Sequence, residues 1–238
     1  MFRIIVFLLF ATVVMILSLP FALITACTLG SGIRKTVHPV PKWIAAHPVK
    51  WAAAICGIKC DRRGEENIPD GPALYVCNHQ GIADILLSIT QLGDVKSFVA
   101  KKEAEKIPLI HFWMKSFDCV FIDRSDPREG LKAINRAAEL LEAGRSVIIY
   151  PEGTRSRGPE MGEFKHGALK CAVKAGVPVI PVAYDNSYAI YEATGRIHPG
   201  TVKMAILPPV STEGRKTAEL ADEVQQIMQA QLDAFRKE

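Results

Sequence analysis

With 238 residues, of which 49% are hydrophobic and 23% charged, the chain is long and apolar enough for one substantial domain with a buried core, which excludes a disordered or fibrous protein. The net charge is +4, and none of the 25 acidic residues precedes Asp61. This wholly basic first quarter favours an anionic membrane surface over a nucleic acid as the partner.

The amino-terminal segment from Ile4 to Leu29 carries no charged side chain. As a straight helix it would be roughly 39 Å long, which exceeds the roughly 30 Å of a bilayer's hydrocarbon core. Tilt, or a bend at Pro20, would accommodate the excess. A two-armed hairpin is the alternative, because Gly30-Ser31-Gly32 is a turn signal and Pro41 to Gly57 is a second apolar stretch. Spanning and one-leaflet arrangements both remain open.

Basic and aromatic residues around the second stretch indicate how the segment would be oriented. Tryptophans beside lysines are typical of a segment that lies at the depth of the lipid headgroups, and the second stretch has Trp43 and Trp51 beside Lys42 and Lys50. Only Arg3 precedes the first stretch, whereas four basic residues follow it closely, namely Arg34, Lys35, Lys42 and Lys50. The positive-inside rule then predicts that the remainder of the chain faces the cytoplasm, at a bacterial inner membrane.

A cleaved signal peptide is the other interpretation of this segment, because Ile24-Thr25-Ala26-Cys27 resembles a lipoprotein cleavage box. The apolar run is long for a signal core, and only Arg3 precedes it, so a retained anchor is favoured. We therefore expect two parts, a membrane-anchoring helical segment over residues 1–60 and a catalytic domain over residues 61–238.

The six cysteines form neither a Cys-x-x-Cys pair nor a regular spacing. They are Cys27, Cys56, Cys60, Cys77, Cys119 and Cys171. Several lie inside apolar runs, as reduced core thiols do in a cytosolic domain. Neither a disulfide framework nor a metal site is expected.

After Asp61, short apolar runs alternate with helical patterns. The predicted strands are Leu74 to Cys77, Val95 to Ala100, Cys119 to Ile122, Val147 to Tyr150, Val179 to Ala183 and Val202 to Ile206. Helices are predicted after the cap Asp126-Pro127 as far as Gly144, over Ala168 to Ala175, and over Thr217 to Phe235. This alternation predicts an α/β domain with a largely parallel central sheet flanked by helices, whose ligands collect at the carboxyl ends of the strands.

Two polar blocks follow predicted strands. In the first, Asn78 to Asp84, His79 precedes Asp84 by five residues. In a regular helix that offset turns the second side chain about 140° away, so the two meet only across a non-helical turn, for which Gly81 supplies backbone freedom. The carboxylate would then fix the imidazole tautomer and leave a base for a substrate hydroxyl. An isolated pair of this kind is more often a solvated histidine and a helix-capping aspartate.

The second block, Tyr150 to Arg157, has the residue types of an anion site. Backbone N–H groups, a hydroxyl and a guanidinium converge there, in Glu152, Gly153, Thr154 and Arg155. Arginine binds phosphate through two parallel hydrogen bonds, which lysine does not offer. Arg124 and Lys101 also follow strands and are further candidates, although a single basic residue is usually a solvated surface charge. Glu152 could instead position Arg155 or Arg124 without touching substrate. Nucleotide-binding glycine motifs and a Gly-x-Ser-x-Gly elbow are missing from the sequence.

Taken together, these blocks resemble the 1-acyl-sn-glycerol-3-phosphate acyltransferases, also called lysophosphatidic acid acyltransferases, within the glycerolipid acyltransferases. Asn78 to Asp84 is similar to the His-x4-Asp block of that family, Phe121 to Arg124 to the second block, Tyr150 to Ser156 to the third, and Val179 to Val182 to the fourth. The likeness covers roughly Gly71 to Pro209. Family members often carry serine and then a large apolar or aromatic residue where this chain has Gly81-Ile82.

The resemblance implies an enzyme of phospholipid biosynthesis that acts on membrane lipids and needs no cofactor or metal. His79 would deprotonate the sn-2 hydroxyl of lysophosphatidic acid, which attacks the thioester of acyl-CoA or acyl-carrier protein and gives phosphatidic acid. Asp84 would orient His79. The acceptor's phosphate end would be held by Arg124, Glu152, Gly153, Thr154 and Arg155, with Lys101 as a further candidate.

Two alternatives stay open beside this expectation. The same motifs would serve another lyso-lipid acceptor, such as a lyso-phospholipid or a lyso-aminolipid. A membrane-anchored lipid-binding protein without turnover is the alternative from a different class.

Overall fold

The computed structural model describes the backbone of residues 2–27, 39–94, 96–107, 110–123 and 125–238, and the account of side chains also leaves out 21–23, 25–27, 39–45, 112, 116 and 127. The expected turn at Gly30-Ser31-Gly32, the basic residues Arg34 and Lys35, and Arg124 lie outside the described residues. So do the side chains of Lys42 and Trp43.

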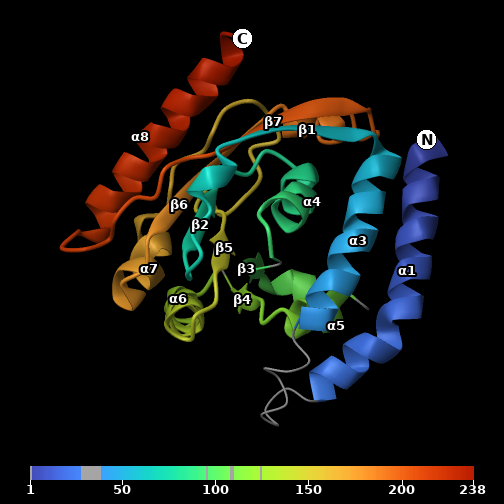
Figure 1. Ribbon diagram of the computed structural model, residues 1–238, viewed down its shortest axis with the longest axis horizontal. Helices are drawn as coiled ribbons and strands as arrows, with labels where there is room; N and C mark the ends of the chain where they lie inside the picture. The colour runs from blue at the N-terminus through green and yellow to red at the C-terminus, as the bar shows by residue number, and fades with distance from the viewer. Residues whose placement is uncertain (1, 28–38, 95, 108–109, 124) are drawn as a thin grey trace.

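A single seven-stranded sheet runs through the described part of the chain in the order β1-β7-β6-β2-β5-β3-β4 (Figure 1). Its strands are β1 (Ile58–Arg63), β2 (Leu74–Cys77), β3 (Ser97–Lys101), β4 (Val120–Ile122), β5 (Val147–Ile149), β6 (Val179–Asp185) and β7 (Gly200–Ile206). Neighbouring strands pair parallel from β6 through β2, β5 and β3 to β4. At the other side of β6, β7 pairs antiparallel with β6, and β1 pairs parallel with β7. The carboxyl ends of β5, β2 and β6 therefore lie side by side at one edge.

Helices cover both faces of this sheet. They are α1 (Phe2–Cys27), α3 (Pro39–Cys56), α4 (Ile82–Gln91), α5 (Ile110–Ser116), α6 (Pro127–Glu142), α7 (Lys170–Ala175) and α8 (Thr217–Arg236), with short 3-10 turns η1 (Glu65–Asn67), η2 (Lys102–Lys106), η3 (His166–Leu169) and η4 (Ser187–Ile190). The expected helix after Asp126 begins where its cap predicts, because the Asp126 carboxylate accepts a hydrogen bond of 2.8 Å from the Arg128 N–H.

Alternate residues of the strands enter two separate cores. Leu74 and Val76 of β2 pack in the core shared with α6, α7 and α8, whereas Tyr75 and Cys77 pack with α4 on the other face. Side chains of successive strand residues point to opposite faces, so one short strand serves both cores. This two-faced burial is why β2 reads as an uninterrupted apolar run, and it confirms the predicted α/β fold with helices on both sides.

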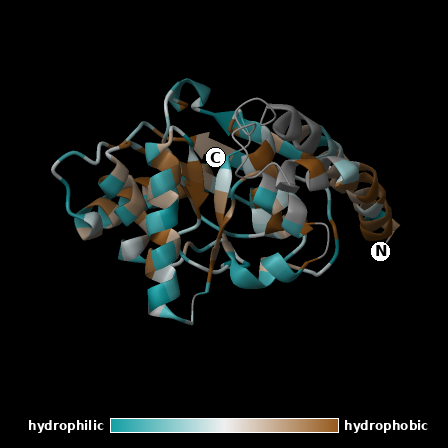
Figure 2. Ribbon diagram, turned by 90° about the horizontal axis from the view of Figure 1, so that it is seen from below, coloured by the Kyte–Doolittle hydropathy of each residue, from teal (hydrophilic) through white to brown (hydrophobic). Residues whose placement is uncertain are grey.

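The amino-terminal helices α1 and α3 form an antiparallel pair beside the layers of the sheet domain. The Arg3 guanidinium donates to the Ile55 carbonyl oxygen at 3.2 Å, and the rings of Phe10 and Trp51 meet edge to face at 6.3 Å. Farther along α1, the indole N–H of Trp113 in α5 donates to the Ser18 hydroxyl at 3.0 Å. The outer face of α1 stays exposed and apolar (Figure 2), with Leu9 63% and Leu17 76% accessible. The pair packs on the domain that carries the sheet, with α1 against α5 and α3 against α4 and β1.

Two details of the sheet were not predicted. Strand β1, Ile58–Arg63, crosses the expected boundary between residues 60 and 61, and it has no continuous apolar run, because four of its six residues are charged. The antiparallel pairing of β7 with β6 was also missed, because the direction of a strand leaves no trace in its own composition. All six expected strands are present, with ends that match the expected ones or differ from them by at most two residues.

Candidate active site

The first polar block forms a histidine-aspartate contact at the carboxyl end of β2. His79 is the second residue beyond the strand, and Asp84 lies in the first turn of α4. Between them, His79 Nδ1 and Asp84 Oδ2 are 3.0 Å apart, and the same carboxylate oxygen accepts the Gly81 N–H at 2.8 Å. Asp84 is fully buried, whereas the His79 side chain keeps 14% of its surface accessible. The imidazole is therefore anchored on its inner side and open on its outer side.

This contact selects one form of the imidazole. A carboxylate can only accept, so Nδ1 carries the proton in the neutral ring and Nε2 keeps its lone pair. The Tyr150 ring stacks on the imidazole with centroids 4.2 Å apart. Hydrogen bonds through the Ser88 hydroxyl fix this tyrosine in turn, at 3.0 Å to Tyr150 and 2.8 Å to Tyr184. Burial raises the pKa of Tyr150 well above its ordinary value, so its phenol stays protonated.

The second block is joined to the first by backbone hydrogen bonds. The Ser156 N–H donates to the His79 carbonyl oxygen at 2.8 Å, and the Arg157 N–H donates to that of Gln80 at 3.2 Å. In the other direction, the His79 N–H donates to Glu152 Oε1 at 2.6 Å. The loops after β2 and β5 thus behave as one structural unit, although 73 positions separate Glu152 from His79 along the chain.

Glu152 has a structural role at this junction. Its second carboxylate oxygen, Oε2, accepts the Gly162 N–H at 2.8 Å, so backbone donors occupy both oxygens. The residue is only 7% accessible. Burial, with a smaller contribution from the nearby Asp84 carboxylate, raises the pKa of Glu152 to about 7 against these two hydrogen bonds. Glu152 therefore holds the His79 backbone, and among the described residues Arg155 pairs with Glu192 and not with Glu152.

Glu152 predicts a pH dependence of stability. Its folded-state pKa of about 7 lies above the ordinary 4.5, so the folded protein binds more protons than the unfolded chain between these pH values. The free energy of unfolding should therefore fall as pH rises through that window, by about 3 kcal/mol at 1.36 kcal/mol per pKa unit. Denaturant titrations at several pH values should show this slope in the native chain and lose it in Glu152→Gln. Glu213→Gln, at an exposed position, is the control, and equal slopes in all three proteins would contradict the assignment.

Arg155 meets a carboxylate from a third loop. Its Nη1 donates to Glu192 Oε1 at 2.8 Å, and the same oxygen accepts the Ile82 N–H at 2.9 Å. The Arg155 side chain is 35% accessible, whereas that of Glu192 is 3% accessible. The guanidinium thus has one side fixed in the protein and further N–H groups available for an anion.

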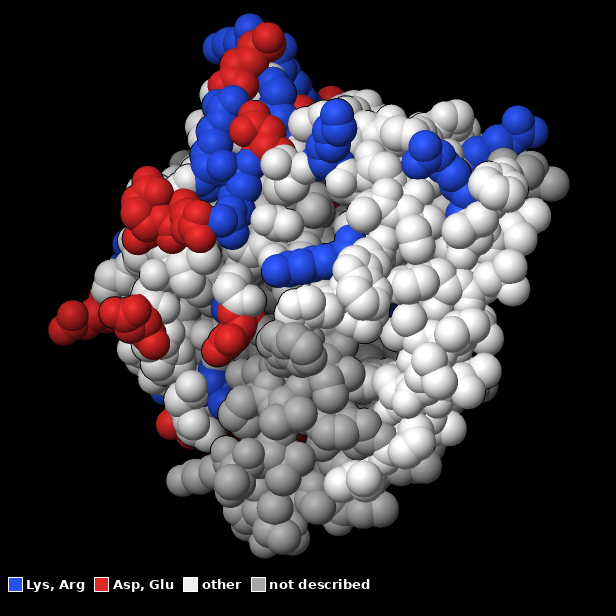
Figure 3. Space-filling model, turned by 45° about the vertical axis from the view of Figure 1, so that its right-hand side comes forward, with Lys and Arg blue, Asp and Glu red and all other residues white. Residues whose placement is uncertain are grey.

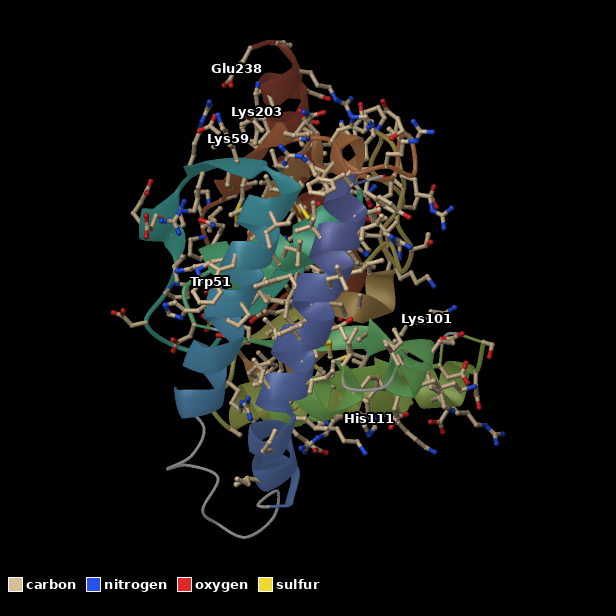
Figure 4. The ribbon with its side chains drawn as sticks, turned by 90° about the vertical axis from the view of Figure 1, so that its right-hand side faces the viewer. Trp51, Lys59, Lys101, His111, Lys203 and Glu238 are labelled. Carbon is tan, nitrogen blue, oxygen red and sulfur yellow. The ribbon has the colours of Figure 1, made fainter. Side chains whose placement is uncertain are left out.

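The other residues expected to bind the phosphate are not all gathered around His79 and Arg155. Gly153 adopts a left-handed φ of +74° at a tight turn, and Thr154 is exposed on that turn. Lys101 ends β3 (Figure 4), where its ammonium pairs with Glu103 at 2.8 Å, and no hydrogen bond or ion pair of the described residues joins it to His79 or Arg155. Arg124 lies outside the described residues, so its part in the site stays a prediction.

An apolar cavity of about 360 Å³ adjoins the second block. Val99, Ile122, Leu131 and Ile149 contribute its apolar wall, and Lys165 lies beside Gly153 at the polar end. Tyr150 borders this cavity and also stacks on His79. An apolar substituent of a substrate could therefore lie within reach of the imidazole.

Sequence reasoning missed Glu192, Ser88 and Tyr184. Glu192 lies in the connection between β6 and β7, where no motif or regular spacing ties it to the two blocks. Ser88 and Tyr184 sit within apolar runs, as core residues also do. The one signal in the sequence was for Ser88, whose hydroxyl is expected on the buried side of the helix that carries Asp84. Gly81, by contrast, has an extended φ of −163° that any residue adopts, so backbone freedom is not what the turn requires.

Comparison with known proteins places the chain in a family. A family model described as Acyltransferase matches residues 59–185, which is more than half of the chain. A chloroplastic 1-acyl-sn-glycerol-3-phosphate acyltransferase of Brassica napus is 37% identical over 169 residues, covering 69% of this chain and 48% of the relative. The alpha form of that enzyme from Mus musculus is 32% identical, covering 78% of this chain and 67% of the relative.

A solved structure is also similar. The crystal structure of the 1-acyl-sn-glycerophosphate acyltransferase PlsC from Thermotoga maritima is 29% identical, with a TM-score of 0.81, and the match covers 100% of this chain and 96% of that one. The chain spans about half the length of the chloroplastic relatives from Brassica napus and Arabidopsis thaliana. On the matched domain and the shared fold, the chain belongs to the acyltransferase family.

Proposed function

We propose that the chain is a 1-acyl-sn-glycerol-3-phosphate acyltransferase, which moves a fatty acyl group to lysophosphatidic acid and yields phosphatidic acid. The observation that carries the proposal is the contact of 3.0 Å between His79 Nδ1 and Asp84 Oδ2, on a loop joined by hydrogen bonds to the loop of Arg155. One loop supplies a base for a hydroxyl, and the other supplies a cation for a phosphate.

The proposed reaction uses each group once. His79 Nε2 removes the proton of the sn-2 hydroxyl as its oxygen attacks the thioester carbonyl carbon of acyl-CoA or acyl-carrier protein. When the tetrahedral intermediate collapses, the carbon–sulfur bond breaks and the imidazolium returns the proton to the leaving thiolate. Asp84 orients the ring and stabilises its charged form. Atoms and charges balance with the two substrates alone, so the proposal includes no cofactor or metal.

The acceptor's phosphate would lie at the second block. Arg155 would bind it with the N–H groups that do not contact Glu192, and the turn at Gly153-Thr154 would add backbone and hydroxyl donors. We assign Glu152 to holding the His79 backbone, and we retain Arg124 as a further phosphate ligand. Lys101 would act on the acceptor only if its exposed ion pair with Glu103 opens.

Membrane lipids are the proposed surroundings of this site. One described helix, α1, is long and apolar enough to cross a membrane by length and composition. Figure 3 shows a broad surface with few charged side chains down the right of the view, whereas charged side chains gather toward its top and left. We propose that α1 and α3 attach the chain to an inner membrane with the catalytic domain in the cytoplasm, where acyl donors are formed. Flotation with lipid vesicles tests the attachment, and a chain that stays wholly unbound would contradict it.

The decisive experiment is an acceptor panel with the purified full chain and a radiolabelled acyl donor. Lysophosphatidic acid should be the best acceptor, and lyso-phospholipids with a blocked phosphate or lyso-aminolipids should be poor ones. Good turnover of a phosphate-free lyso-lipid without turnover of lysophosphatidic acid would refute the proposal in favour of the other acceptor class.

A further inference from the structure

Glu192 contacts both polar blocks from the connection between two strands, far from either block along the chain. It lies between β6 and β7, beyond residues 59–185 of the family match. Its Oε1 accepts from Arg155 Nη1 at 2.8 Å and from the Ile82 N–H at 2.9 Å. A single carboxylate oxygen thus connects the arginine of the second block to the first turn of the helix that carries Asp84.

The other oxygen of Glu192 fills a space beside Gly81. A Cβ atom at position 81 would lie far inside van der Waals contact of Glu192 Oε2. This oxygen is buried and has no hydrogen-bond partner among the described residues. Because the Gly81 backbone is extended, a side chain there meets no torsional obstacle, and the carboxylate is what excludes it. Gly81 and Glu192 are therefore complementary in shape.

The connection that carries Glu192 is held independently of its carboxylate. Gln80 Oε1 accepts from the Ser187 N–H at 3.1 Å and from its hydroxyl at 3.2 Å. Farther along, the His198 N–H donates to the Ile190 carbonyl oxygen at 2.9 Å. Loss of the Glu192 carboxylate should leave this segment in place, so its effect on the site can be separated from an effect on the fold.

We propose that Glu192 is a positioning residue for Arg155, which fixes one edge of the guanidinium so that its remaining N–H groups face the acceptor's phosphate. A guanidinium is a rigid planar fork, so holding one nitrogen sets the direction of the others. The shared contact with the Ile82 N–H ties that direction to the loop that carries His79. The inference rests on the proposed function, because it concerns how the same phosphate is held.

Glu192→Gln tests the charge with little change of shape. The amide oxygen can still accept from Ile82, but the hydrogen bond to Arg155 loses its ionic partner. We expect KM for lysophosphatidic acid to rise about tenfold, while KM for the acyl donor and kcat stay within about twofold. Glu223→Gln, which removes the carboxylate of the partly exposed ion pair with Arg215, is the matched control and should leave all three constants unchanged.

Gly81→Ala tests the same contact from the opposite side. The added Cβ must displace the Glu192 carboxylate, which is the movable end of a flexible side chain, so the fold should survive while Arg155 is released. The KM for lysophosphatidic acid should rise as in Glu192→Ala, and the double variant should be no worse than either single one, because both changes break one contact. Thermal unfolding of each variant verifies that it is folded.

The outcomes separate this inference from the proposed function. If the native chain does not acylate lysophosphatidic acid, the proposed function fails before any variant is compared. If the native chain is active and Glu192→Gln leaves the acceptor KM unchanged, or raises the two substrate KM values equally, the positioning role is overturned. Fully additive effects of Gly81→Ala and Glu192→Ala would overturn it as well.

Discussion

Replacing His79 with alanine should lower kcat for acyl transfer by about 10³-fold, because general-base catalysis typically contributes about 10²- to 10⁴-fold. The carboxylate of Asp84 cannot take over as the base, because it is fully buried on the Nδ1 side of the ring. The backbone contacts of His79 with Glu152 and Ser156 do not involve its side chain, so the two loops should keep their arrangement. The KM for lysophosphatidic acid should therefore change little.

The measurement is steady-state acyl transfer by purified His79→Ala, with thermal unfolding as the check on folding. His166→Ala is the control, because His166 also pairs with an aspartate at 3.0 Å, but its side chain is largely exposed and its partner, Asp222, lies on α8 and in neither block. The control should retain native activity. A folded His79→Ala protein that keeps a tenth or more of native kcat would show that another group takes the proton.

Arg155→Ala should raise KM for lysophosphatidic acid by about 30-fold or more and KM for the acyl donor by less than about threefold, as loss of a charged phosphate contact requires. The substitution also leaves the 3% accessible Glu192 side chain without its cation. A buried, unpaired carboxylate is costly, so the free energy of unfolding should fall by about 2 kcal/mol as well.

Arg155→Lys and Arg136→Ala make this test specific. Lysine restores the charge but not the planar fork, so Arg155→Lys should recover stability more fully than acceptor KM. Arg136 forms an exposed pair with Glu139 on α6, and its loss should change neither constant. Equal KM increases for both substrates in Arg155→Ala would contradict a phosphate contact.

The parts of the fold that the sequence predicted are those encoded by local pattern. The cap at Asp126 and the continuous apolar run of β2 located their elements because capping geometry and two-sided burial act on neighbouring residues. β1 was missed because, with one surface partly exposed, it lacks a continuous apolar run. Strand direction at β7 follows from tertiary pairing, which no single segment records.

The candidate site shows the same division. His79, Asp84 and Arg155 were identified because each stands in a compact polar block after a strand. Glu192 lies 37 positions beyond Arg155 and resembles any surface glutamate in the sequence. The sequence predicts that Gly81 supplies backbone freedom, whereas in the structure its backbone is extended and a carboxylate from that distant segment occupies the space of a side chain.

The hydrogen bonds from Ser156 and Arg157 to the carbonyl oxygens of His79 and Gln80 have a consequence for substrate binding. Each loop restricts the torsional freedom of the other before any lipid arrives. The conformational entropy of the two loops is therefore lost during folding, at about 1 to 2 kcal/mol for each ordered residue, and not at the encounter with substrate. Because the two loops are already ordered, a lipid that binds between them need not supply the free energy of ordering them before it reacts.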